Sequence, residues 1–307
     1  MQRFLLRRLI TTLVTLLAVS LIVFAMARVS GDPRDLLIDD TQVGDVELFE
    51  ALGRELGLDK PYYQQYGIFL KDLLQGDLGQ SVKEQRPVLD AIKERIGNTL
   101  ALGLAAFAFS VLAGVPLGIL SSVKRGSFLD QFSKVVALIG QSAPPFWLGI
   151  MFIFFFAVRL GWTPPSGHQE WNSIILPAVT LGWFFVAANL RLVRSAMLDV
   201  LDSEYIKLAR AKGVTRNSII WKHALKNALI PPLTFAGVSL GNLVTGSLVT
   251  ETVFAWPGLG QAAIQSVWSN DYPMLQGVVI IFTLMYVGAA LLVDVLYAYL
   301  DPRIRYA

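Results

Sequence analysis

Side chains able to carry out chemistry are few in this 307-residue chain, and they are far apart in the sequence. The chain has no cysteine, which excludes disulfides, thiolate metal sites and cysteine nucleophiles. Its only histidines are His168 and His223, and no Gly-x-x-x-x-Gly-Lys-Ser/Thr loop is present to hold nucleotide phosphates. We therefore expect no catalytic residue, no metal site and no cofactor bound by this chain.

Polar residues that interrupt or follow apolar stretches are the other candidates. Such residues line solute routes or make hydrogen bonds between helices. Glu251 is the acid we expect to face a translocation route or a neighbouring subunit, the alternative being a hydrated interface position. Asp294 is predicted to be structural, paired with Arg303 or Arg305. As a group, the translocation-path candidates are Gln141, Ser142, Asn189, Asn242, Thr245 and Glu251.

The elements that must position these residues are membrane helices. The chain is 54% hydrophobic and 16% charged, with a mean hydropathy of +0.54, which excludes an ordinary cytosolic enzyme and a disordered protein. An uncharged helix of about 20 residues crosses the ~30 Å hydrocarbon core. Six such stretches predict an all-α membrane protein with six transmembrane helices: Leu9–Ala27, Thr99–Leu120, Val135–Val158, Ser173–Leu190, Ala228–Thr250 and Tyr272–Val293.

The first stretch also resembles a signal peptide, because arginines precede it and it ends in Ala25-Met26-Ala27. Its apolar run exceeds the usual 7–15 residues of such a signal, so we expect an uncut helix.

Basic residues set the orientation. Sixteen of the 26 Lys and Arg residues lie in segments 1–8, 121–134, 191–227 and 294–307. The short loops on the other side, 159–172 and 251–271, hold only Arg159. By the positive-inside rule both termini face the cytoplasm, which places His168 and His223 on opposite sides of the membrane.

The outer segment 28–98 is too polar to span. Asp59-Lys60-Pro61 predicts a helix start and Gly76 a stop, with one apolar face formed by Tyr66, Phe69, Leu70, Leu73 and Leu74. Within the spans, proline kinks are expected at Pro116, Pro144-Pro145, Pro177 and Pro231-Pro232. Gly114-x-x-x-Gly118 and Gly237-x-x-x-Gly241 predict close helix contacts.

The inner loop 201–231 is the most informative segment. Asp202 or Ser203 is predicted to cap a helix that runs to about Lys212 and stops at Gly213, and Thr215 to cap a second helix leading to Pro231. At 1.5 Å per residue the first helix is about 14 Å long, too short to cross a bilayer. A short basic helix of this kind suits docking into a partner's groove. The alternative is a loop that only obeys the positive-inside rule.

The segments Ala209-Arg-Ala-Lys-Gly213 and His223-Ala-Leu-Lys-Asn-Ala-Leu-Ile-Pro231 resemble the cytoplasmic coupling (EAA) loop of type I ABC importer permeases. Lys207-Leu208-Ala209 stands where Glu-Ala-Ala is general, a change shared by the oligopeptide/dipeptide/nickel branch. The long first outer loop resembles that of the B-type subunit in this branch. Further motifs of the branch occur here in the same order: Ser30-Gly-Asp-Pro33, Leu56-Gly-Leu-Asp-Lys-Pro61, Gly76-Asp-Leu-Gly-Gln-Ser81, Asn98-Thr-Leu100, Trp256-Pro-Gly-Leu-Gly260, Asp271-Tyr-Pro273, Asp294-Val-Leu-Tyr297 and Asp301-Pro302.

This resemblance implies a type I ABC importer permease fold in the bacterial cytoplasmic (inner) membrane. Its parts would be a cytoplasmic N-terminus and first helix (1–27), an extracytoplasmic segment (28–98), a five-helix core with the coupling loop (99–300) and a cytoplasmic tail (301–307). It implies partners as well: a second homologous permease, two ATPases that use ATP and Mg, an extracytoplasmic solute-binding protein and the lipid bilayer, with no nucleic acid. The ATPases would hold the 204–213 helix through Glu204, Tyr205, Ala209, Arg210, Ala211, Lys212 and Gly213.

Other classes stay open at this point. A self-sufficient secondary transporter or channel would need ionisable groups within the spans or an inverted repeat. A membrane enzyme would need a catalytic cluster, and half of an ABC exporter would carry an ATPase domain, which we do not expect after residue 307. The branch carries peptides, glutathione, nickel complexes, opines and short oligosaccharides, with selectivity set mainly by the binding protein.

Overall fold

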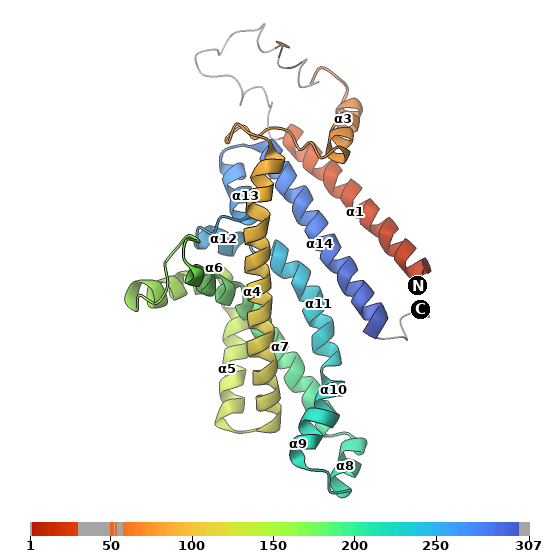
Figure 1. Ribbon diagram of the computed structural model, residues 1–307, viewed down its shortest axis with the longest axis vertical. Helices are drawn as coiled ribbons and strands as arrows, with labels where there is room; N and C mark the ends of the chain where they lie inside the picture. Colours follow the sequence, from red (N-terminus) through yellow and green to blue (C-terminus); the bar gives the residue numbers. More distant parts are fainter. Residues whose placement is uncertain (1, 30–49, 52, 54–57, 301–307) are drawn as a thin grey trace. The chain divides into compact units, whose positions relative to one another are not determined.

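Helices and the turns between them make up the computed structural model of the protein (Figure 1), which describes residues 2–29, 50, 51, 53 and 58–300. The predicted all-helical fold is confirmed. The chain folds into two compact units, each built from segments that are distant in the sequence. Unit 1 comprises Met1–Asn98 with Pro257–Gly288, and unit 2 comprises Thr99–Trp256 with Ala289–Ala307. The expected tail 301–307, much of the 28–61 segment, and the side chain of Asp294 lie outside the described residues.

Unit 1 is formed by helices from the start of the chain together with helices from its C-terminal third. It contains α1 (Gln2–Val29), α3 (Tyr62–Leu74), the start of α4 (Val88–Val123), α13 (Leu259–Trp268) and most of α14 (Tyr272–Leu300). In Figure 1, α1 and α14 run beside each other, and the Gln276 side chain donates a hydrogen bond to the Val23 carbonyl (3.3 Å). The start of α4 packs on α14, where a Cβ on Gly277 would lie 2.6 Å from a methyl group of Val88.

The predicted helix of the outer segment is α3, which begins at Tyr62 and is followed by Gly76 at φ +81°. Two of its expected apolar residues, Tyr66 and Phe69, pack on Phe24 of α1 with ring centroids 5.4 and 5.7 Å away. Leu74 is 88% exposed, so the predicted apolar face is packed only in part.

Unit 2 is built around α7 (Ile175–Leu201), in which about two thirds of the apolar stretch is buried. It contacts α5, α6 and α11 and runs on from the 3-10 turn η3. The other elements of the unit are the rest of α4, α5 (Phe128–Ser142), α6 (Pro145–Phe152), η2 (Ile153–Arg159), η3 (Trp171–Ile174), α8 (Glu204–Ala211), α9 (Arg216–Ser218), η4 (Ile219–Ala224), α10 (Leu225–Ala228), α11 (Ile230–Thr245) and α12 (Leu248–Val253).

Four helices in the described ranges are long and apolar enough to cross a membrane, or five if one bent pair counts as a single span. The four match the predicted first, second, fourth and sixth spans. The predicted third span is broken at Pro144-Pro145, where α5 meets the α6–η2 segment at 113°. The predicted fifth span, Ala228–Thr250, is interrupted at Leu229 and Gly246, which leaves the 16 residues of α11 between them. At 1.5 Å per residue α11 is about 24 Å long.

The prolines explain these breaks only in part. Pro144 and Pro145 separate two helices, and Pro231 lies at the start of α11, where a missing N–H has no helical partner to lose. Neither Pro177 nor Pro116, where kinks were expected, ends a helix. Pro177 lies in the first turn of α7, and α4 continues through Pro116.

The glycine pairs bring helices into close contact, as predicted. A Cβ on Gly114 would lie 2.8 Å from the Val186 carbonyl oxygen, and one on Gly118 would lie 2.8 Å from the Leu190 carbonyl oxygen. These two glycines therefore set the approach of α4 to α7. In the second pair, Gly237 of α11 meets Val293 of α14, with 2.6 Å between its hypothetical Cβ and a methyl group.

We expect Gly118→Val to destabilise the protein by about 1–3 kcal/mol, because a backbone oxygen of α7 cannot move aside as a flexible side chain can. The measurement is the thermal unfolding temperature of the purified protein in detergent. Gly97→Ala is the matched control, since nothing lies within 4 Å of a Cβ at that helical position. An equal loss of stability in both variants would contradict the packing argument.

Candidate functional site

The predicted short helix of the inner loop is α8, Glu204–Ala211. Lys207 forms an ion pair with Glu204 (2.7 Å) one turn away. The helix stops as predicted at Gly213, whose φ is +78° and whose N–H donates to the Arg210 carbonyl (3.0 Å). Ser203 is the N-cap residue, but its side chain does not cap. Its hydroxyl donates to the Val200 carbonyl (2.5 Å) instead.

One residue anchors α8 to the rest of unit 2. Ile206 is fully buried, and it belongs to an apolar cluster drawn from the ends of α4 and α7, from η4 and from α10. The buried members of this cluster, here called the coupling core, are Ile119, Val193, Met197, Ile206, Ile219, Ile220, Ala224 and Ala228. The sequence analysis did not single out Ile206. Its signal was an aliphatic residue flanked by charged and polar ones in a short amphipathic helix.

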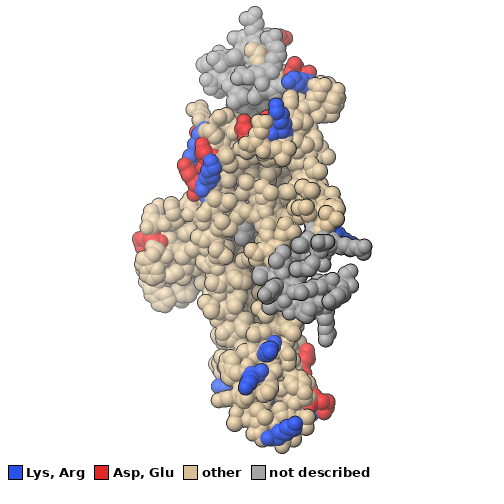
Figure 2. All heavy atoms as spheres, turned by 45° about the vertical axis from the view of Figure 1, so that its right-hand side comes forward, with Lys and Arg blue, Asp and Glu red and all other residues tan. Residues whose placement is uncertain are grey.

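The opposite side of α8 is open. Of the seven residues predicted to couple to an ATPase, Glu204, Tyr205, Arg210, Ala211, Lys212 and Gly213 are exposed, and Ala209 is half-buried. Leu208, which was not predicted, adds an aliphatic side chain that is 56% exposed. In Figure 2, Lys and Arg side chains lie over the lower end of the view, with Asp and Glu side chains on one side of it, where Figure 1 places α8 and α9. The helix thus exposes a small surface with more basic than acidic residues, while Ile206 on its other side is buried.

Hydrogen bonds tie α8 to the segment that leads into α11. Asn227 donates from its side-chain amide to the Tyr205 hydroxyl (2.9 Å), and that hydroxyl donates to the His223 carbonyl (3.4 Å). Between them lies η4, a π-helical segment, a form that is rare and frequent at functional sites. Tyr205 is therefore exposed on α8 and also contacts the segment that leads into α11. Asn227 belongs to the matching motif 223–231, but its contact with Tyr205 was not predicted.

A buried acid fixes the same end of unit 2. Asp130 accepts hydrogen bonds from the Arg194 Nε (2.9 Å), the Ser121 hydroxyl (2.6 Å) and the Gly126 N–H (3.0 Å). Lys134 adds an ion pair at 3.1 Å. Because these partners come from α4, from the α4–α5 turn, from α5 and from α7, one carboxylate joins three helices near the coupling core.

The predicted translocation-path residues do not gather at one point. Gln141 lines a cavity of about 470 Å³ between α5 and α7, and Ser142 and Asn242 are exposed. Thr245 is half-buried and donates its hydroxyl hydrogen bond to the Gly241 carbonyl (3.2 Å). Asn189 is buried beside Ser110, 3.5 Å from that hydroxyl, and its side-chain oxygen has no hydrogen-bond partner among the described atoms.

Glu251 is not at a hydrated interface within this chain. Its side chain is fully buried and accepts hydrogen bonds from the hydroxyls of Thr99 (2.9 Å) and Ser247 (2.7 Å). A buried carboxylate is stabilised by such donors. Glu251 thus joins α12 to the part of α4 that belongs to unit 2, a role that its place beyond an apolar stretch did not reveal.

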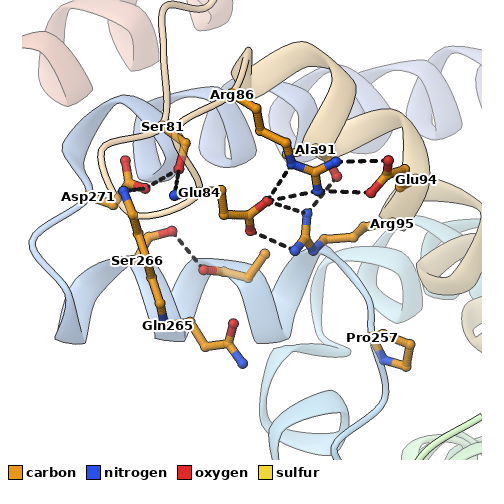
Figure 3. A network of polar contacts seen from close by, with 12 residues as sticks. Ser81, Glu84, Arg86, Ala91, Glu94, Arg95, Pro257, Gln265, Ser266 and Asp271 are labelled. Atoms are coloured by element: carbon orange, nitrogen blue, oxygen red, sulfur yellow. Dashed lines mark hydrogen bonds and ion pairs between the residues drawn. The ribbon is translucent and has the colours of Figure 1, made fainter.

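A polar network in unit 1 holds the loop before α4 (Figure 3). Asp271 accepts from the Ser81 hydroxyl (2.5 Å) and the Lys83 N–H (3.2 Å), and Glu84 pairs with Arg95 (2.6 Å). Arg86 donates two hydrogen bonds to Glu94, each 2.8 Å, and one to Glu84; these glutamates raise the pKa of its guanidinium above the ordinary value. The motif residues Ser81 and Asp271 are therefore direct partners. Among the described residues, no group of three or more His, Cys, Asp or Glu forms a metal-binding cluster.

Two family models match the chain. Residues 114–306 match the binding-protein-dependent transport system inner membrane component, and residues 1–103 match the N-terminal membrane component of such systems. The chain belongs to this family of permeases. It is a non-catalytic, multi-pass subunit of a bacterial inner-membrane ABC importer, in which ATP is used by partner ATPases and solute is delivered by a binding protein.

Among curated relatives, the chain is 39% identical to the glutathione transport system permease protein GsiC of Escherichia coli K12, over 307 residues and the full length of both proteins. It is 36% identical to the dipeptide transport system permease protein DppB of Alkalihalophilus pseudofirmus, over 335 aligned residues and both full lengths. A solved structure of the MetNI methionine ABC transporter in an inward-facing conformation matches with a TM-score of 0.58 at 23% identity. That match covers 69% of this chain and 96% of the other, and it supports the fold.

Proposed function

We propose that this chain forms half of a translocation pathway with a second, homologous permease, and that α8 couples the pathway to a cytoplasmic ATPase. The observation that carries the coupling role is the mounting of α8: Ile206 is buried in the coupling core while Leu208 and the charged residues face outward. When an ATPase displaces a helix held in this way, the contacts of Ile206 transmit the displacement to α4, α7 and α10.

Orientation follows from the same assignment. We place α8, both termini and the α4–α5 turn in the cytoplasm, which agrees with the positive-inside rule. The same rule places segments 28–98 and 251–271 on the outer side of the membrane, and these are the segments to which a solute-binding protein would dock.

The solute is proposed to be glutathione or a short peptide, because the full-length relatives above are permeases for these compounds. Gln141, Ser142, Asn242 and Thr245 are the proposed pathway residues, since the structure leaves each at least partly exposed. We assign Asn189 and Glu251 supporting roles behind that surface, because both are buried. ATP binding must favour one conformation over the other, since a ligand with equal affinity for both shifts nothing.

Leu208→Asp tests the docking surface. We expect the substitution to weaken ATPase association by at least about 2 kcal/mol, or roughly thirtyfold, if Leu208 is an apolar anchor of the interface. The measurement is a mild-detergent pull-down of the tagged chain, expressed from its native locus, with quantitative mass spectrometry of the ATPases and of the second permease.

Leu208→Met is the matched control, because it keeps an apolar side chain of similar size at the same position. We expect it to retain the ATPases, and we expect both variants to retain the second permease. Full ATPase recovery with Leu208→Asp would contradict the proposed coupling surface.

A further inference from the structure

A second feature of unit 2 is a cavity of about 510 Å³ where the ends of α4 and α7 meet α8, α9 and η4. Its wall combines three arginines and one acid with an apolar floor. The lining residues used below are Val123, Arg125, Leu198, Asp202, Arg210 and Arg216.

The three arginines come from different elements: Arg125 from the α4–α5 turn, Arg210 from α8 and Arg216 from α9. Within the described part of the chain, none of them forms an ion pair with a carboxylate. Asp202 also lines the cavity, so the wall carries more positive charge than negative. Uncompensated guanidinium groups around one cavity attract an anion.

Two of these arginines are held in place by backbone carbonyls. Arg210 donates to the Leu201 carbonyl and Arg216 to the Val123 carbonyl, each at 3.3 Å. Such bonds use only one of the five N–H donors of a guanidinium, and the remaining donors stay available to a ligand. Each bond restricts an otherwise exposed side chain, which lowers the conformational entropy that these two arginines would lose when a ligand binds.

A neighbouring cationic cavity makes a useful contrast. The cavity of about 470 Å³ between α5 and α7 is lined by Lys134, Arg191 and Arg194. Two of these, Lys134 and Arg194, already form ion pairs with the Asp130 carboxylate. In the cavity beside α8, by contrast, no arginine is paired with a carboxylate among the described residues. All three guanidinium groups are therefore available to a bound anion.

We propose that this cavity binds a phosphate group through Arg125, Arg210 and Arg216. Guanidinium forks match phosphate oxygens in bidentate geometry, which favours phosphate over a monovalent halide. The apolar floor, which includes Val123 and Leu198, adds space for an apolar portion next to that phosphate. The phosphate belongs either to the headgroup of an anionic membrane lipid or to a free phosphate ion. Bound there, it bridges α8 and α9 to the α4–α5 turn.

The test uses the full-length chain in phosphatidylcholine nanodiscs. One arm adds phosphatidylglycerol and counts retained lipid by native mass spectrometry, and the other titrates inorganic phosphate and follows ³¹P line broadening. The variants are Arg125→Gln and the double variant Arg125→Gln/Arg216→Gln. Arg125 is chosen because its native side chain makes no hydrogen bond within the described residues, so its loss removes no internal contact of that kind. Lys222→Gln is the control, because Lys222 is an exposed cation on η4 outside the cavity.

We expect Arg125→Gln to weaken binding about tenfold in at least one arm, and the double variant more, with Lys222→Gln unchanged. Loss in the phosphatidylglycerol arm alone identifies a lipid headgroup, and loss in the phosphate arm identifies the free ion. Binding as in the wild type by both cavity variants in both arms would overturn the proposal, as would an equal loss with Lys222→Gln. Because the readout is binding, its failure leaves the proposed coupling to an ATPase untouched.

Discussion

Replacing Gly213 with proline is expected to abolish solute uptake while leaving the protein in the membrane. Gly213 has a φ of +78°, whereas the proline ring fixes φ near −65°, so α8 cannot end as it does in the native chain. Proline also removes the N–H that donates to the Arg210 carbonyl. The conflict costs about 3 kcal/mol or more, enough to reduce the population of correctly mounted α8 roughly a hundredfold.

Uptake of labelled glutathione and of a labelled dipeptide by cells with the complete importer is the measurement, with membrane fractionation to count inserted protein. Gly213→Asn is the matched control, because asparagine tolerates the left-handed conformation better than other side chains. We expect the asparagine variant to keep most of the uptake. Wild-type uptake by the proline variant would show that transport does not depend on this helix stop.

Much of the fold could be predicted because the membrane leaves few solutions. Uncharged runs must form helices to satisfy their backbone polar groups, and four predicted spans are single helices in the structure. Helix stops depend on local chemistry, so Gly76 and Gly213 were recognisable from residue type alone. Hydropathy does not distinguish one long helix from two short ones. It therefore predicted a continuous 228–250 span where the chain breaks at Leu229 and Gly246.

The exposed residues of the candidate site could be predicted from the sequence, whereas its buried contacts could not. Charge and small residues marked α8, but the burial of Ile206 depends on packing against α4, which is distant in the sequence, as well as against the neighbouring α7 and η4. The same limit applies to Glu251, whose partner Thr99 lies 152 residues away. A single sequence carries no signal for such pairs, because either residue alone is compatible with water or with a pathway.

Asp130 is the clearest interior residue of this kind, and Asp130→Ala is expected to destabilise the protein by about 3–5 kcal/mol. The substitution leaves Arg194, whose side chain is only 23% exposed, without its buried carboxylate, and removes the acceptor of the Ser121 hydroxyl and the Gly126 N–H. Thermal unfolding of the purified protein in detergent measures the loss as a fall of several degrees. Lys134→Gln is the control, since an ion pair with a half-exposed lysine contributes less than about 1 kcal/mol.

A double variant separates the charge from the packing. Most of the cost of Asp130→Ala is the unpaired guanidinium, so adding Arg194→Met should recover part of the lost stability. The recovered protein would still lack the bond that joins α7 to α5, and we expect it to insert and fold but to transport more slowly. Strictly additive losses in the two substitutions would contradict the charge-pair explanation. Full transport in the double variant would show that the coupling core alone keeps these helix ends together.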